Sequence, residues 1–246
     1  MTGDAPELVL DDDGNVRILT LNRPEKLNAL NRSLIEHLTA ELGSAEAAED
    51  VRAVVLAGCP TAFSAGVDLD DTSALSSSDE IRAHADRVAG LFSRISNMTT
   101  PVVAAIEGYA LGGGCGIAMA ADIVVAAEDA VFGYPEATRG VMPALVAPNL
   151  VKRAGAKTAF ALLALGQRQS AATFKELGLV FEITAPGAAR AEALRIAGLL
   201  AGHDSRIIAW IKSLTIDCES LSLDVGFARA RDVNALAREA LKAGGK

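Results

Sequence analysis

The stretch that decides the fold spans residues 103–123 and reads V-A-A-I-E-G-Y-A-L-G-G-G-C-G-I-A-M-A-A-D-I. It combines an apolar strand, a turn at Gly108 and three successive glycines, Gly112, Gly113 and Gly114, which open an alanine-rich helix. Glycines at a strand-to-helix junction let a ligand approach the backbone closely. The amides of the first helical turn have no partner inside the helix and carry the positive end of its dipole. The sequence therefore predicts an anion hole at this junction.

Two nucleotide-binding motifs are excluded by spacing. A dinucleotide fingerprint that includes Gly112 and Gly114 would need a third glycine at position 117, which is Ile117. A phosphate loop would need Gly-Lys-Ser/Thr, and the nearest candidate, Lys157-Thr158, lacks both glycines of the motif. A tight packing turn is the simpler alternative for the glycine triplet.

Composition limits the classes of partner. Half of the 246 residues are hydrophobic, enough for a large core, and the net charge is −8. A nucleic acid or an anionic membrane would require clustered Lys and Arg, so neither is expected as a partner. The three cysteines, Cys59, Cys115 and Cys218, form no C-x-x-C pair and predict neither a disulfide framework nor a zinc site. Without a signal-peptide pattern or an uncharged run of ~20 residues, we expect a cytoplasmic protein that crosses no membrane.

Hydrophobic periodicity predicts alternating strands and helices, and hence an α/β fold. A hairpin over residues 8–21 is followed by a helix that Asn31 caps, with a buried stripe of Leu34, Ile35, Leu38 and Leu42. Further strands are expected at residues 52–57, from 101, and at 122–127, 131–136 and 179–183. Helices are expected at residues 81–95, 140–153, 157–165 and 171–178, and throughout the chain after residue 186.

Two further features indicate a site. Residues 63–69, F-S-A-G-V-D-L, form a second segment of small residues that allows close backbone approach. Glu136 follows a short apolar strand, where burial would raise its pKa toward neutrality, as general acid–base catalysis requires. An ordinary acid at the end of a strand is the alternative for Glu136.

The spacing of Gly108, the glycine triplet, Met119 and Asp122 resembles the signature of the crotonase (enoyl-CoA hydratase/isomerase) superfamily. Other segments match the family pattern in order, namely residues 22–24, 28–30, 63–69, 132–136 and 171–179. The resemblance implies an acyl-CoA-binding core at residues 1–185, built as a spiral of ββα units. It also implies a helical C-terminal region at residues 186–246 that takes part in oligomer packing, in a homotrimer or hexamer. The implied substrate is an acyl-CoA thioester, with no metal and no cofactor beyond the CoA of the substrate.

The resemblance also assigns roles. Two backbone N–H groups, those of Ala65 and Gly113, would form an oxyanion hole, in which one donor is worth ~3 kcal/mol. Glu136 would be the catalytic acid/base. The implied substrate-binding residues are Lys26, Ala29, Ala65, Gly66, Val67, Asp68, Gly112, Gly113 and Gly116. For Asp68, a helix cap is an equal alternative, and Lys26 could also be an ordinary surface lysine.

Gly116 is the main departure, because family hydratases usually carry the first of two glutamates at this position. It marks either a missing acid or room for a branch or carboxylate on the substrate. Together with Pro143-Ala144, it resembles a minority subgroup with a single glutamate that includes hydratases of branched or glutaconyl-type thioesters.

We therefore predict a hydratase-type lyase in which Glu136 is the sole acid/base. The alternatives are a Δ3-Δ2-enoyl-CoA isomerase with Glu136 as proton shuttle, and a catalytically inactive acyl-CoA-binding protein. A hydrolase that uses Ser64 is disfavoured, because the sequence has no G-x-S-x-G elbow and no histidine placed to serve it.

Overall fold

The computed structural model describes residues 5–244, so residues 1–4 and 245–246 of the two predicted regions lie outside the described part. Ten strands within it form two sheets. The larger sheet has the order β1 (Leu8–Asp13), β2 (Val16–Leu21), β3 (Ala53–Ala57), β5 (Val102–Ile106), β7 (Ile123–Ala127) and β10 (Glu182–Thr184). The smaller sheet has the order β4 (Ala62–Ser64), β6 (Tyr109–Leu111), β8 (Val131–Gly133) and β9 (Arg168–Ser170).

The strands are added to the two sheets in pairs. β3, β5 and β7 extend the larger sheet in parallel, and each is followed directly by β4, β6 or β8 in the smaller sheet. Helical segments follow each pair before the chain returns to the larger sheet. This repetition is the predicted α/β spiral of ββα units.

The predicted Asn31 cap is present, and a second helix begins with a capping box that was not predicted. Asn31 caps α1 (Arg32–Ala47), since its side chain accepts a hydrogen bond from the Leu34 amide at 2.8 Å. Ser77 and Glu80 form a capping box at the start of α3 (Ser78–Asn97). Ile81, expected on the buried face of this helix, is 55% exposed, because the stripe that packs into the core begins one turn later.

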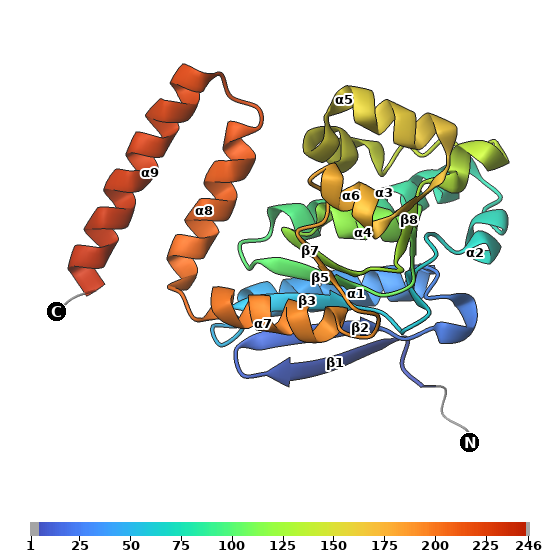
Figure 1. Cartoon of the computed structure of the whole chain (residues 1–246), viewed down its shortest axis with the longest axis horizontal. Coiled ribbons are helices and arrows are strands. Elements are labelled where there is room, and N and C mark those ends of the chain that lie inside the picture. Colours follow the sequence, from blue (N-terminus) through green and yellow to red (C-terminus); the bar gives the residue numbers. More distant parts are fainter. Residues whose placement is uncertain (1–4, 245–246) are drawn as a thin grey trace.

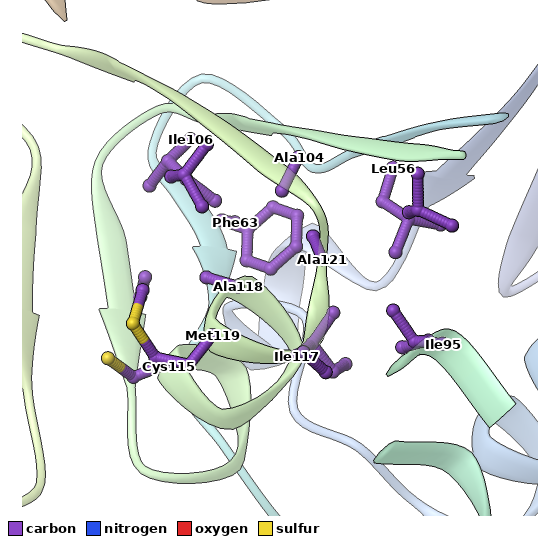
Figure 2. Close-up of a cluster of buried hydrophobic side chains, with 14 of the residues drawn as sticks. Leu56, Phe63, Ile95, Ala104, Ile106, Cys115, Ile117, Ala118, Met119 and Ala121 are labelled. Atoms are coloured by element: carbon purple, nitrogen blue, oxygen red, sulfur yellow. The ribbon is translucent and has the colours of Figure 1, made fainter. Parts of the chain in front are cut away.

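Helix α4 (Gly113–Ala120) lies in the interior, and all of its residues are buried. Figure 2 shows the ring of Phe63 from β4 beside Ala104, Ala118 and Ala121. Small side chains on α4 and on β5 leave space for this aromatic ring. The C-terminal half of α4 therefore packs against strands of both sheets.

Three predicted boundaries were wrong. The strand predicted at residues 131–136 ends at Gly133, because a short helix begins at Pro135. Residues 140–146 are not helical: the short helix η2 (Pro135–Arg139) ends at Gly140 with φ 72, and α5 (Ala147–Leu165) begins only at Ala147. The predicted break between two helices falls within α5, where Gly155 leaves the helical conformation. The last strand is β10 and does not start at residue 179, because the amides of Leu179 and Val180 still donate to Phe174 O at the end of α6 (Ala171–Glu176).

The chain after residue 186 is helical, as predicted, and forms α7 (Ala189–Ala201), α8 (Ser205–Cys218) and α9 (Leu223–Gly244). α7 packs on the larger sheet through buried alanines, whereas α8 and α9 form a hairpin that extends away from the sheets (Figure 1). Lys212 attaches α8 to the body, since its Nζ lies 2.8 Å from Asp122 Oδ2 and 3.2 Å from Ile95 O. None of the helices within residues 5–244 has the length and apolar character that a bilayer span requires.

Candidate active site

The two segments of small residues meet backbone to backbone. Gly66 has φ +97, and a Cβ added to it would lie 2.8 Å from Leu111 O and 3.0 Å from Gly113 N. A side chain at position 66 would therefore separate the two segments, and the positive φ would also strain it. Glycine at this position brings residues 65–68 against the start of α4.

Two amides face this junction without an acceptor. Gly113 is the first residue of α4, so its N–H has no partner inside the helix. A Cβ on Gly113 would lie 3.4 Å from Val67 N, which places the Val67 amide beside it. Neither N–H donates to an acceptor among residues 5–244. The junction therefore offers two adjacent donors to an anionic oxygen.

The amide of Ala65, expected as the partner of Gly113, is already used. It donates to Leu27 O at 2.9 Å, so the free donor on this segment is Val67, two residues further on. The sequence named Val67 only as a substrate contact. Which amide of a short loop remains free depends on the hydrogen bonds between loops, and no residue pattern carries that information.

Ser64 and Asn28 hold the Val67 segment in place, and both are fully buried. Ser64 Oγ donates to Asn28 O at 2.8 Å and accepts from Gly66 N at 3.2 Å. Asn28 in turn donates from Nδ2 to Ala62 O at 2.8 Å. Sequence reasoning placed these residues in family segments but assigned them no role in the site.

Asp68 acts as a helix cap. Its carboxylate accepts from Asp70 N at 3.0 Å at the start of α2 (Leu69–Ser73) and pairs with Arg23 Nη1 at 2.9 Å. Burial alone would raise the pKa of Asp68, but the hydrogen bonds from Arg23 and the Asp70 amide lower it overall. Of the two alternatives for this side chain, the structure shows the cap, and the carboxylate is committed to protein partners.

Glu136 lies against the other side of the glycine junction. Gly112, whose φ is 52, is tied to β8 by its amide, which donates to Gly133 O at 2.8 Å. A Cβ on Gly112 would lie only 2.7 Å from Glu136 Oε1. The other carboxylate oxygen, Oε2, is buried and has no hydrogen-bond partner in the part of the chain that the structure describes. Burial raises the pKa of Glu136, and its own backbone amide and the charge of Arg139 oppose this only in part.

Gly116 leaves no empty space. A Cβ added there would lie 2.7 Å from Phe92 Cζ and 2.8 Å from Val146 Cγ1. Phe92 and Val146 are 3% and 5% exposed, so the space of the absent side chain is filled by apolar groups of the protein itself. This finding does not support the reading that Gly116 makes room for a substrate branch.

The remaining predicted contacts lie on the Val67 side of the junction. Lys26 ends the short helix η1 (Pro24–Lys26), is half exposed and pairs with Asp70 at 2.8 Å. The hydrogen bond to Asp70 raises the pKa of Lys26. The carbonyl of Ala29 accepts a hydrogen bond from Arg23 Nη1, so Ala29 can contact a ligand mainly through its methyl group.

The chain has the site of an acyl-transfer or enolate-forming enzyme: two free amides, a buried carboxyl group and glycines that admit a ligand between them. Residues 11–234 match the family described as enoyl-CoA hydratase/isomerase, and the chain therefore belongs to that family of enzymes.

Relatives and solved structures agree with this assignment. The chain is 38% identical to a putative enoyl-CoA hydratase of Thermus thermophilus over 94% of this chain and 92% of the relative. It is 32% identical to the 2,3-dehydroadipyl-CoA hydratase of Escherichia coli over 92% of this chain and 88% of the relative. A crystal structure of an enoyl-CoA hydratase from Mycobacterium smegmatis superposes with a TM-score of 0.90 at 31% identity, covering 95% of this chain and 91% of that one.

Proposed function

We propose that this protein is an enoyl-CoA hydratase, which adds water to a 2-enoyl-CoA thioester through an enolate, with Glu136 as the sole acid/base. The observation that carries the proposal is the buried, unpartnered Glu136 carboxyl group beside the two free amides. The relatives named above are hydratases, one of them named for a 2,3-dehydroadipyl thioester. Their names favour hydration over the isomerase alternative.

The two donors to the enolate oxygen in this proposal are the amides of Val67 and Gly113. Val67 replaces Ala65 in this role because the Ala65 amide already donates to Leu27 O. The positive end of the α4 dipole lies behind Gly113. Preorganised donors of this kind stabilise the negative charge that develops on the thioester oxygen, and loss of one donor typically costs ~3 kcal/mol in the transition state.

Glu136 has to perform both proton transfers. In its ionised form the carboxylate accepts a proton from water as the water oxygen bonds to C3, and the same carboxyl group then gives a proton to C2 of the enolate. The product contains the whole water molecule, and the carboxylate is regenerated. Burial raises the pKa of Glu136 toward the range in which a carboxyl group can both accept and donate a proton.

Hydration is tested by loss of the conjugated-enoyl absorbance when crotonyl-CoA is added, with Glu136→Gln as the active-site variant and Glu128→Gln, an exposed acid, as the matched control. We expect turnover in the wild type and the control and a loss of about 10²–10⁴-fold in Glu136→Gln, the typical contribution of a general acid–base group.

The alternatives give different results in the same assay. An isomerase would produce the conjugated absorbance from a 3-enoyl-CoA and would hydrate neither crotonyl-CoA nor a glutaconyl-type thioester. An inactive binding protein would bind acetoacetyl-CoA, an enolate analogue, and turn over none of the thioesters. Absence of acetoacetyl-CoA binding at millimolar ligand would remove the acyl-CoA assignment itself.

We also propose a cytoplasmic homotrimer or hexamer that packs through the α8–α9 hairpin. Large apolar side chains on α9 are exposed in the isolated chain, including Leu223 at 75%, Phe227 at 67% and Leu236 at 53%. Burial of such a face in an oligomer is the usual reason for its presence. Light scattering at micromolar concentration tests this assembly, and a stable monomer would contradict it.

A further inference from the structure

The first turn of α4 connects the catalytic carboxyl group to an apolar wall. Gly112 is the N-cap of α4, and Gly116 lies one helical turn later, ~5.4 Å along the axis, where its amide donates to Gly112 O at 2.9 Å. The space above Gly112 is occupied by Glu136, and the space above Gly116 by the rings and methyl groups of Phe92 and Val146. The groups that pack on this part of α4 therefore extend from the Glu136 carboxyl group to the Phe92 ring.

This step rests on the proposed function: the acyl chain of the substrate extends along the groups that run from Glu136 to Phe92. The thioester oxygen lies between the amides of Val67 and Gly113, and the Gly113 face points toward Val67 and Leu30. Because the CoA moiety leaves on the side of these loops, the carbons beyond C3 extend in the other direction, past Glu136. The next contacts along α4 are those of Phe92 and Val146.

Behind Phe92 lies an open cleft of about 330 Å³ between α3, α5 with the segment before it, and α8. Phe92 contributes to its apolar lining together with Ala89, Leu145 and Pro148, and the cleft is also lined by charged groups of Lys152, Arg153 and Glu219. Since the Phe92 ring lies directly against Gly116 and also lines the cleft, it stands between α4 and the cleft.

We propose that Phe92 is a specificity-determining residue that closes the distal end of the acyl pocket and restricts this enzyme to short-chain 2-enoyl thioesters. Gly116 is part of the same device, because only a residue without a side chain lets the ring lie directly on α4. Removal of the ring opens the way into the cleft, where the distal carbons of a longer chain can pack against Ala89, Leu145 and Pro148.

The test compares kcat/KM for 2-decenoyl-CoA and crotonyl-CoA in the wild type, Phe92→Ala and Phe92→Leu. Each methylene that becomes buried contributes ~0.8 kcal/mol, about fourfold in kcat/KM. The decenoyl-to-crotonyl ratio should therefore rise at least about tenfold in Phe92→Ala, with Phe92→Leu between it and the wild type.

Leu91→Ala is the matched control, because Leu91 is a fully buried neighbour on α3 that does not line the cleft. This variant also creates a cavity in the core, so it controls for loosened packing, and its ratio should stay at the wild-type value. An unchanged ratio in both Phe92 variants would overturn the proposal. So would a wild type that prefers decenoyl-CoA.

A binding experiment separates failure of this inference from failure of the proposed function. If the wild type turns over no enoyl thioester, calorimetry with acetoacetyl-CoA and 3-oxodecanoyl-CoA gives the same comparison without catalysis. A tenfold gain in the affinity for 3-oxodecanoyl-CoA relative to acetoacetyl-CoA in Phe92→Ala, with no gain in Leu91→Ala, supports the proposal that Phe92 limits the length of the acyl chain. Equal relative affinities in all variants reject it, whatever the reaction proves to be.

Discussion

Replacement of Gly116 by glutamate restores the acid that family hydratases usually carry, and the structure predicts that it will not restore their activity. The new Cβ would lie 2.7 Å from Phe92 Cζ and 2.8 Å from Val146 Cγ1, both atoms of buried side chains. Overpacking of this kind costs ~1–3 kcal/mol, whereas loss of a helical glycine returns ~1 kcal/mol.

These two effects leave Gly116→Ala destabilised by about 0–2 kcal/mol. Gly116→Glu adds the cost of a carboxyl group against Phe92 and Val146, about 1–3 kcal/mol if it finds no partner. We therefore expect Gly116→Glu to lose about 1–5 kcal/mol of unfolding free energy, as the sum of these terms. Crotonyl-CoA hydration should fall below the wild-type rate.

Urea unfolding and crotonyl-CoA hydration measure the two effects in the same preparations. Gly90→Glu is a suitable control, because Gly90 lies in α3 and a Cβ there meets nothing within 4 Å. The cost of Gly116→Ala should also shrink in a Phe92→Ala background, since the nearest clashing group is then absent. Full stability together with faster hydration in Gly116→Glu would refute this reasoning.

Three further predictions follow from the buried polar groups. Ser64→Ala removes the hydroxyl that bonds both Gly66 N and Asn28 O, so kcat/KM should fall about tenfold. The binding free energy of acetoacetyl-CoA should weaken by a matching ~1.4 kcal/mol, and that of butyryl-CoA should change little. Equal losses for both ligands would contradict a role of Ser64 in placing the enolate donors. Lys212→Met leaves the partly exposed Asp122 carboxylate without its cation, although Val102 N still donates to it, and should cost ~1–3 kcal/mol in urea unfolding, whereas a second change of Asp122 to Asn should recover part of that loss. Burial raises the pKa of Glu136 in the folded state, so the unfolding free energy falls as pH rises from the ordinary pKa of 4.5 through the raised one. Relative to the wild type, Glu136→Gln should therefore be more stable above this pH window and similarly stable below it. A stability difference that does not change with pH would count against a raised pKa.

The sequence predicted the fold well because its signals are local. The glycine triplet that opens α4, the Asn31 cap and the alternation of strands and helices each depend on neighbouring residues, and each is present in the structure. The errors at residues 140–146 and at 179 arise where a turn, and not hydrophobic periodicity, fixes the end of an element.

The details of the site depend on contacts between distant residues. The family resemblance named the Ala65 amide as a donor, whereas in the structure that amide donates to Leu27 O and the Val67 amide is free. Likewise, the space above Gly116 is filled by Phe92, which comes from another helix. No spacing rule predicts that packing, although the glycine itself signals that something approaches α4 closely.

The central claim is that one carboxyl group, Glu136, both activates water and protonates the enolate on a single face of the thioester. The most direct measurement is hydration of crotonyl-CoA in D2O, with the position and relative configuration of deuterium in the 3-hydroxybutyryl product determined by NMR. The account predicts one deuterium at C2, on the same face as the new hydroxyl group, and no product from Glu136→Gln. Deuterium on the opposite face, or undiminished hydration by Glu136→Gln, would contradict it.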